Sequence, residues 1–150
     1  MLSGKLIRLV EAHHKEITNR IIREMWRHPG LAHLRRLPEA ELRERCQIIL
    51  ENFGDWLASE KEEELAKQQE AVGALRYEQG VPAHEVVRAL CLFKYNIIDF
   101  VEEQGIPTDP LGLYAEEELE HRIGCFFDTL IIYSVRGYES AWHRSAHAAV

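Results

Sequence analysis

Apolar residues recur every three or four positions along most of this chain, which is the spacing of one face of an α-helix. Proline and glycine interrupt the pattern, so it predicts five helical segments, over residues 4–27, 38–57, 59–79, 82–104 and 113–146. No segment alternates apolar and polar residues as a half-buried strand would. The sequence therefore predicts an all-α fold, with residues 1–150 forming a single-domain bundle of four to five helices.

Local signals support these boundaries. Ser59 and Glu62 have the spacing of a capping box at the start of the third segment. Gly80 is expected to end that segment in a left-handed C-cap, with Pro82 following it. The first half of the segment, residues 60–70, is so charged that it is expected to be a solvated edge.

The last segment is unusually long and contains no proline. A helix over residues 113–146 would span about 50 Å, more than the width of a globule of this size. One of its faces is apolar and is expected to enter the core: Leu119, Ile123, Phe126, Phe127, Leu130 and Ser134. The helix must therefore protrude, bend or pack against a second copy of the chain.

A second patch lies on roughly the opposite side of this segment and comprises His121, Cys125, Ile132, Val135 and Trp142. Either another helix of the bundle covers this patch, or the patch pairs with its symmetry mate in a twofold dimer. We favour a homodimer, because the helix is longer than its own bundle. Gly124 and Gly137 would permit close helix approach or bending.

Composition narrows the functional classes. The net charge is −7, with no basic cluster longer than Arg35-Arg36, which argues against a nucleic-acid partner. No apolar run approaches the roughly 20 residues that cross a bilayer, so no membrane insertion is expected. Three widely spaced cysteines within helical segments indicate reduced, mostly buried thiols in a cytoplasmic protein.

Two E-x-x-H spacings, Glu11 with His14 and Glu118 with His121, are the type that di-iron helical bundles use. Glu11 points to the side of the apolar face of its segment, and the second pair points nearly opposite the apolar face of the last helix. No nucleophile elbow, zinc-protease or phosphate-binding motif is present. We therefore expect no catalytic residue, no cofactor and no metal, and a protein that is not an enzyme.

Lys94 is the exception among the charged residues, because it lies near the apolar face of the most apolar segment. An unpaired buried ammonium is costly, so its side chain must reach solvent or find a polar partner. Either Lys94 extends along the edge of the bundle, or it makes a polar contact in a ligand pocket or at a subunit contact.

The sequence contains three landmarks: Asp55-Trp56-Leu57, the run at residues 76–82 (RYEQGVP), and the run at residues 85–90 (EVVRAL). They resemble the N-terminal domain of the RsbR-type co-antagonist (RsbRD-like) proteins of bacterial stress signalling. Phe126-Phe127-Asp128 and Tyr133 are also similar. The likeness extends over residues 10–140.

The resemblance implies a dimeric helical sensory module, with a globin-like bundle that has lost haem and a last helix that leads into an output domain. The sequence stops at Val150 with neither a phosphorylatable domain nor a kinase module. The expected protein is therefore an input domain separated from its output, or one that acts alone on a protein partner.

Two functional hypotheses remain. The favoured one is a non-enzymatic signalling input module that dimerises and relays a packing change through its long last helix. The alternative is a globin-like protein that binds a small molecule or haem. Haem would need a histidine directed into a pocket, and only His14 and His84 lie near an apolar face.

Overall fold

Every regular element in the described part of the chain is helical. The computed structural model describes residues 2–58, 60–104 and 109–148. Its helices are α1 (Leu2–Ala12), α2 (His14–Arg27), α3 (Glu39–Glu51), α4 (Phe53–Leu57), α5 (Glu62–Glu78), α6 (Ala83–Glu103) and α7 (Pro110–Ala148), with the short 3-10 turns η1 (Pro29–Leu31) and η2 (Leu34–Arg36) between α2 and α3. The all-α fold and the long C-terminal helix are therefore confirmed.

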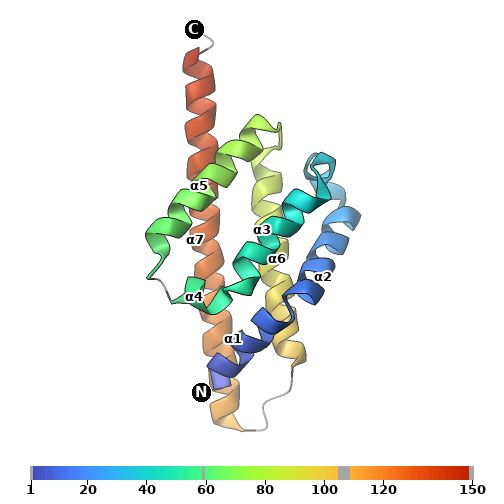
Figure 1. Cartoon of the computed structure of the whole chain (residues 1–150), viewed down its shortest axis with the longest axis vertical. Coiled ribbons are helices and arrows are strands. Elements are labelled where there is room, and N and C mark those ends of the chain that lie inside the picture. Colours follow the sequence, from blue (N-terminus) through green and yellow to red (C-terminus); the bar gives the residue numbers. More distant parts are fainter. Residues whose placement is uncertain (1, 59, 105–108, 149–150) are drawn as a thin grey trace.

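The long helix α7 is the axis of the molecule (Figure 1). Helix α6 runs beside it in the opposite direction, and α5 crosses it near the upper end of the bundle in Figure 1. Helices α2 and α3 pack on each other, α2 also packs on α6, and α1 and α4 reach α7. The bundle thus packs against one side of α7 and leaves its C-terminal end projecting.

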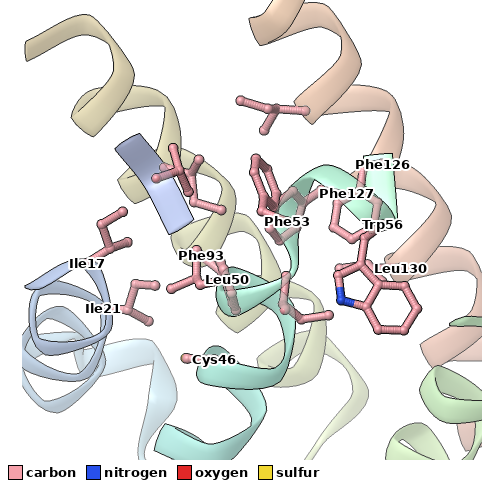
Figure 2. Close-up of a cluster of buried hydrophobic side chains, with 14 of the residues drawn as sticks. Ile17, Ile21, Cys46, Leu50, Phe53, Trp56, Phe93, Phe126, Phe127 and Leu130 are labelled. Carbon is pink, nitrogen blue, oxygen red and sulfur yellow. The ribbon is translucent and has the colours of Figure 1, made fainter. Parts of the chain in front are cut away.

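An aromatic cluster lies at the centre of the core (Figure 2). The ring of Phe127 lies 5.1 Å from that of Phe93 on α6 and 5.4 Å from that of Phe126, centroid to centroid. The Phe53 ring of α4 meets Phe126 edge to face at 6.0 Å. The predicted apolar face of α7 is confirmed in full, since all six of its residues, from Leu119 to Ser134, are buried.

The count of four to five helices is too low, because two predicted helices are broken. The first break is at His13, whose backbone (φ −103°, ψ 24°) leaves the helical region between α1 and α2. The His13 Nδ1 lies 2.9 Å from the Leu9 carbonyl oxygen, and the ring packs 5.4 Å from that of Phe100. The contact with α6 fixes the change of direction.

The second break is at Asn52 (φ −123°, ψ 37°), between α3 and α4. Immediately afterwards the Gly54 N–H donates to the Glu11 carboxylate at 3.1 Å. Glu11 on α1 thereby satisfies a free donor at the start of α4 and supplies the negative charge that a helix N-terminus favours. A new helix starts there because a distant carboxylate caps it.

The turn between α5 and α6 follows the predicted pattern. Gly80 has a positive φ of 76°, which confirms the left-handed C-cap. The N–H groups of Gly80 and Val81 donate to the carbonyls of Tyr77 and Arg76, both at 3.0 Å. The predicted capping box involves Ser59, which lies outside the described residues.

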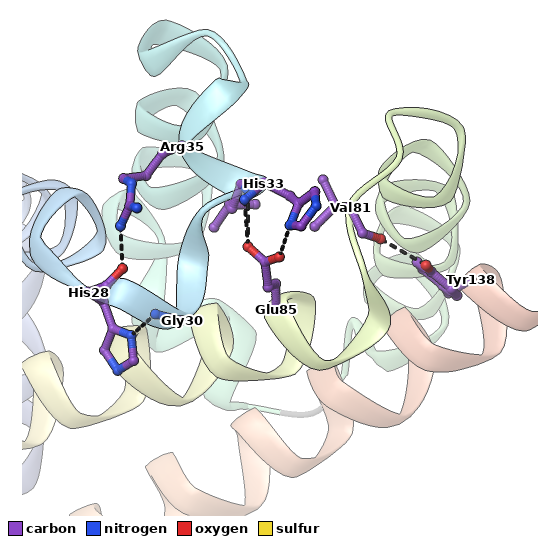
Figure 3. Close-up of polar contacts among 8 residues, drawn as sticks. His28, Gly30, His33, Arg35, Val81, Glu85 and Tyr138 are labelled. Carbon is purple, nitrogen blue, oxygen red and sulfur yellow. Dashed lines mark hydrogen bonds and ion pairs between the residues drawn. The ribbon is translucent and has the colours of Figure 1, made fainter.

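A buried carboxylate joins this turn to the 3-10 segment (Figure 3). Glu85 is 2% exposed and accepts hydrogen bonds from the backbone N–H groups of His33 (3.0 Å) and Leu34 (3.1 Å) and from the His33 ring at 2.6 Å. Burial alone would raise the pKa of Glu85, but these donors hold it below its usual value. The carboxylate therefore stays ionised and fixes the start of α6 to η2.

Helices α5 and α7 cross with their backbones in direct contact. A Cβ atom on Gly73 would lie 1.9 Å from the Ser134 carbonyl oxygen, and a Cβ atom on Gly137 would lie 1.9 Å from the Glu70 carbonyl oxygen. Neither position can hold a side chain unless the helices separate. The close approach expected at Gly137 is present, whereas a Cβ on Gly124 would meet nothing within 4 Å.

The C-terminal end of α7 extends past the bundle (Figure 1). The helix has 39 residues and is therefore about 58 Å long. Ala141 is its last buried residue, and residues 142–148 are all exposed. Of the three outcomes expected for so long a helix, protrusion is observed.

The crossing gives a direct test of the fold. Gly73→Ala should destabilise the protein by about 1–3 kcal/mol or more, because its methyl group would overlap the α7 backbone. Gly124→Ala should be neutral or stabilise the protein by up to about 1 kcal/mol, because alanine favours an open helical position. Urea denaturation monitored by circular dichroism measures both changes. Equal stabilities for the two variants would contradict the crossing.

Candidate functional site

The exposed side of α7 carries a continuous stripe of residues. Its members are His121, Cys125, Asp128, Ile132, Val135, Glu139 and Trp142, named here the α7 stripe. Successive members are alternately four and three positions apart. An average spacing of 3.5 is the repeat of a left-handed coiled coil, so one straight face of the helix is offered to a partner helix.

The five predicted interface residues all belong to this stripe. Ile132 and Trp142 are 58% and 55% exposed, which is high for large apolar side chains. His121 and Cys125 are exposed and Val135 is half-buried. The expectation that the cysteines are mostly buried is therefore wrong for Cys125, whose Sγ lies 3.6 Å from the His121 Nε2. A role of these residues in a dimer stays a prediction.

A groove of about 220 Å³ borders the N-terminal half of the α7 stripe. Trp56, Leu57 and Leu65 form one wall, and His121 and Cys125 lie on the other. This groove could receive a side chain from a partner helix, which would increase the apolar area buried by pairing.

A cavity of about 70 Å³ lies on the inner side of α7, is partly open to solvent, and is named here the internal cavity. Five helices contribute to it: α2, α3, α5, α6 and α7. Most of its wall is apolar, including Leu42, Ile49, Val86, Phe93 and Leu130. Figure 2 shows Phe93, Leu130 and the buried Cys46, which also borders the cavity, in this region of the core.

One end of the cavity is polar. Arg45 on α3 donates from Nη2 to the Gln69 side-chain oxygen at 2.6 Å, and the Gln69 amide donates to the Ser134 Oγ at 3.1 Å. Gln69 and Ser134 are 3% and 1% exposed. This chain of hydrogen bonds joins α3, α5 and α7 next to the crossing of α5 with α7.

The polar end holds two guanidinium groups with unequal partners. Arg76, 5% exposed, pairs with Glu41 at 2.5 Å and also donates to Gln79 at 2.8 Å. Arg45 forms no ion pair within the part of the chain that the structure describes. Burial, and then the charge of Arg76, lower the pKa of Arg45. Among the described residues, Arg76 therefore has a paired acid, whereas Arg45 lies near Glu44 without an ion pair and no acidic side chain lines the cavity.

Sequence reasoning missed this polar end. Gln69 lies within residues 60–70, the part of α5 expected to be solvated, yet it is buried. The residue that could have indicated this polar end is Arg45, which lies at helical spacing from Leu42 and Ile49 on an apolar face. A charged residue in such a position indicates either a buried partner or a site.

Lys94 adopts a different environment. It is half-buried, and its ammonium lies 4.7 Å from the centroid of the Tyr95 ring, which is 56% exposed. Lys94 is not among the residues that line the internal cavity. A pocket or subunit contact through Lys94 therefore stays a prediction.

Neither of the two histidines considered for haem faces the internal cavity. His14 Nε2 lies 3.9 Å from a Glu51 carboxylate oxygen, while Glu11 is used in the cap of α4. His84 is exposed in the first turn of α6, and neither His14 nor His84 lines the cavity. Within residues 2–58, 60–104 and 109–148, no three His, Cys, Asp or Glu side chains form a group that could hold a metal ion.

These features correspond to a known class of domain. Residues 15–149 match the model of the RsbT co-antagonist protein rsbRD N-terminal domain, and the chain therefore belongs to this family, as the resemblance predicted. Membership identifies the chain as a stress-signalling input domain. No curated protein and no solved structure matches it. None of the described helices has the length and apolarity needed to span a bilayer.

A cluster of carboxylates lies near the other end of α7. Glu120 is half-buried there, and Glu102 of α6 is its neighbour. Burial, the hydrogen bond and charge of Glu102, and the charges of Glu116 and Glu117 raise the pKa of Glu120 to about 7. The charged form of Glu120 is therefore disfavoured in the folded chain up to about neutral pH.

The raised pKa predicts a pH-dependent stability. The folded state binds this proton more tightly than the unfolded chain, so the contribution of Glu120 is complete below its ordinary pKa and is lost as pH rises to about 7. Glu120→Gln should therefore raise the melting temperature near pH 8 and change it little near pH 5. Glu118→Gln, at an exposed position of the same helix, is the control. If both variants show the same pH dependence of the melting temperature as the unsubstituted protein, the raised pKa does not belong to Glu120.

Proposed function

We propose that this chain is a non-enzymatic, cytoplasmic input module that dimerises through the α7 stripe and relays a packing change along α7. The packing change is passed to a fused output domain or to a separate protein of the signalling pathway. One observation carries the proposal. The same part of α7 borders the internal cavity with Leu130 and Ser134 and presents Ile132 and Val135 on the stripe.

The α7 stripe is suited to pairing with a second copy. A twofold axis parallel to α7 would place each stripe against itself, so that Ile132 meets Ile132 and Trp142 meets Trp142. Burying a large apolar side chain completely contributes about 1.5–3 kcal/mol. Asp128 and Glu139 interrupt the apolar residues, which favours a contact that can rearrange over one that is permanently buried.

A parallel arrangement also brings the two projecting ends together. Residues 142–148 of both copies would leave the bundle side by side. A small rotation or translation of α7 within the bundle would then change how these ends pair. An output domain that follows them would receive the change as a difference in spacing or register.

The relay requires two arrangements of α7 that a signal can favour unequally. The contacts of α7 with its own bundle can supply them. Near the crossing, Tyr138 donates to the Val81 carbonyl at 2.8 Å (Figure 3), and Tyr133 donates to Glu62 at 3.2 Å. Because the α5 and α7 backbones touch at Gly73 and Gly137, α7 cannot move inward there without displacing α5.

The dimer is tested at the centre of the stripe. Ile132→Asp places two carboxylates against each other across the twofold axis, and should weaken association by about 100-fold or more. Because Ile132 is exposed in the single chain, the fold itself should be retained. Sedimentation velocity over a range of protein concentrations measures the change.

Leu75→Asp is the matched control, since Leu75 is an exposed aliphatic residue of α5 outside the stripe (40% exposed). It should sediment as the unsubstituted protein does. If Ile132→Asp leaves the sedimentation coefficient unchanged while circular dichroism shows a folded protein, the dimer face is misplaced.

A further inference from the structure

The internal cavity resembles a ligand site in which no acidic side chain of the described residues pairs with the guanidinium at its polar end. Arg45 is its charged donor, and the described residues offer it a neutral partner, Gln69, at 2.6 Å. Arg45 is half-buried, and a guanidinium that has lost part of its hydration is stabilised by a charged partner. Arg76, close by, already has Glu41 as its acid. The guanidinium of Arg45 therefore attracts an anion to its end of the cavity.

The size of the cavity limits the part of an anion that it can enclose. One water molecule needs about 10–15 Å³ of comparable volume, so 70 Å³ holds the equivalent of about five to seven water molecules. A ligand of about five to seven non-hydrogen atoms fits without rearrangement. Nucleotides and haem are far larger than this.

The wall chemistry decides between kinds of anion. A phosphate carries oxygens on all sides, and some of them would face Leu42, Ile49, Phe93 and Leu130 without hydrogen-bond partners. A carboxylate has its two oxygens at one end, which matches the planar fork of a guanidinium. A short apolar tail would then lie against the aliphatic and aromatic wall. We propose that the cavity binds a small monocarboxylate with an apolar tail, held by Arg45.

Binding would alter the contacts of α7. A carboxylate that binds both Nη groups of Arg45 displaces the side-chain oxygen of Gln69 from Nη2. Displacement of Gln69 changes its hydrogen bond to Ser134 on α7, which is 3.1 Å long in the present arrangement. The ligand thereby prefers one arrangement of α5 against α7. This step rests on the relay proposed above, and it names the class of signal that would drive it.

The experiment compares butyrate with butyramide, its neutral counterpart with the same number of non-hydrogen atoms. Melting temperatures of the full chain are measured against increasing sodium butyrate or butyramide, with ionic strength held constant by sodium chloride. Butyrate should raise the melting temperature in a saturable manner, since a ligand that binds only the folded state stabilises it. Butyramide should have little effect. Equal effects of the two compounds, or no saturation with butyrate, would overturn the proposal.

Substitutions locate the site. Arg45→Met keeps an unbranched apolar stem but removes the guanidinium and its charge, and should weaken butyrate binding by at least about tenfold. Arg43→Met is the matched control, because Arg43 is on the same helix and pairs with Glu39 at 3.1 Å instead of facing the cavity. If Arg45→Met binds butyrate as well as Arg43→Met does, the assignment of Arg45 is wrong.

A measurement on the unsubstituted protein locates the binding site even if the Arg45→Met variant does not fold. In ¹⁵N–¹H correlation spectra, butyrate should shift amide signals around Arg45, Gln69 and Ser134. Shifts confined to exposed positions would overturn the internal site. Saturable binding of inorganic phosphate in place of butyrate would overturn the carboxylate class.

The failure of this inference can be distinguished from failure of the proposed function. If butyrate does not bind but Ile132→Asp abolishes the dimer, only the ligand class is rejected. If butyrate binds through Arg45 but Ile132→Asp has no effect on sedimentation, the ligand site stands and the dimer relay is rejected.

Discussion

The backbone contact between α5 and α7 is the constraint on which the rest of the structure depends. Gly73 and Gly137 let the two helices approach until the backbone of each occupies the space of a side chain on the other. That approach brings Gln69 within hydrogen-bond distance of Ser134, and through Gln69 it connects Arg45 to α7. It also fixes which face of α7 enters the core, and therefore which face carries the α7 stripe.

The fold was largely predictable because most of its information is local. The apolar face of α7, the left-handed Gly80 and the segment boundaries follow from helical spacing and from glycine and proline. The breaks at His13 and Asn52 were not predictable, because their causes are distant in sequence. His13 packs on Phe100, and Glu11 caps α4 at Gly54. Such pairs come together only after the helices have packed.

The α7 stripe and the polar end of the cavity also differ in how far apart their residues lie in the sequence. The α7 stripe lies on one helix, so the spacing of Ile132, Val135 and Trp142 was sufficient to propose it. The polar end of the cavity is assembled from three helices, and neither Gln69 nor Ser134 is conspicuous alone. The sequence singled out Lys94 as a charged residue on an apolar helix, but its ammonium lies over the ring of Tyr95. A charged residue that does border the cavity is Arg45 on α3.

The central claim is that two copies of α7 lie parallel along the α7 stripe, so that the internal cavity and the projecting ends belong to one relay. The most direct test is the distance between spin labels at position 145, introduced as Ser145→Cys in a chain that also carries Cys91→Ser and Cys125→Ser, since both of these thiols are accessible to a label. Parallel helices 8–10 Å apart place the two labels within about 25 Å of each other. An antiparallel pair centred on Ile132 would place them about 40 Å apart, and a monomer would give no dipolar coupling. The account predicts the short distance, and either of the other results would contradict it.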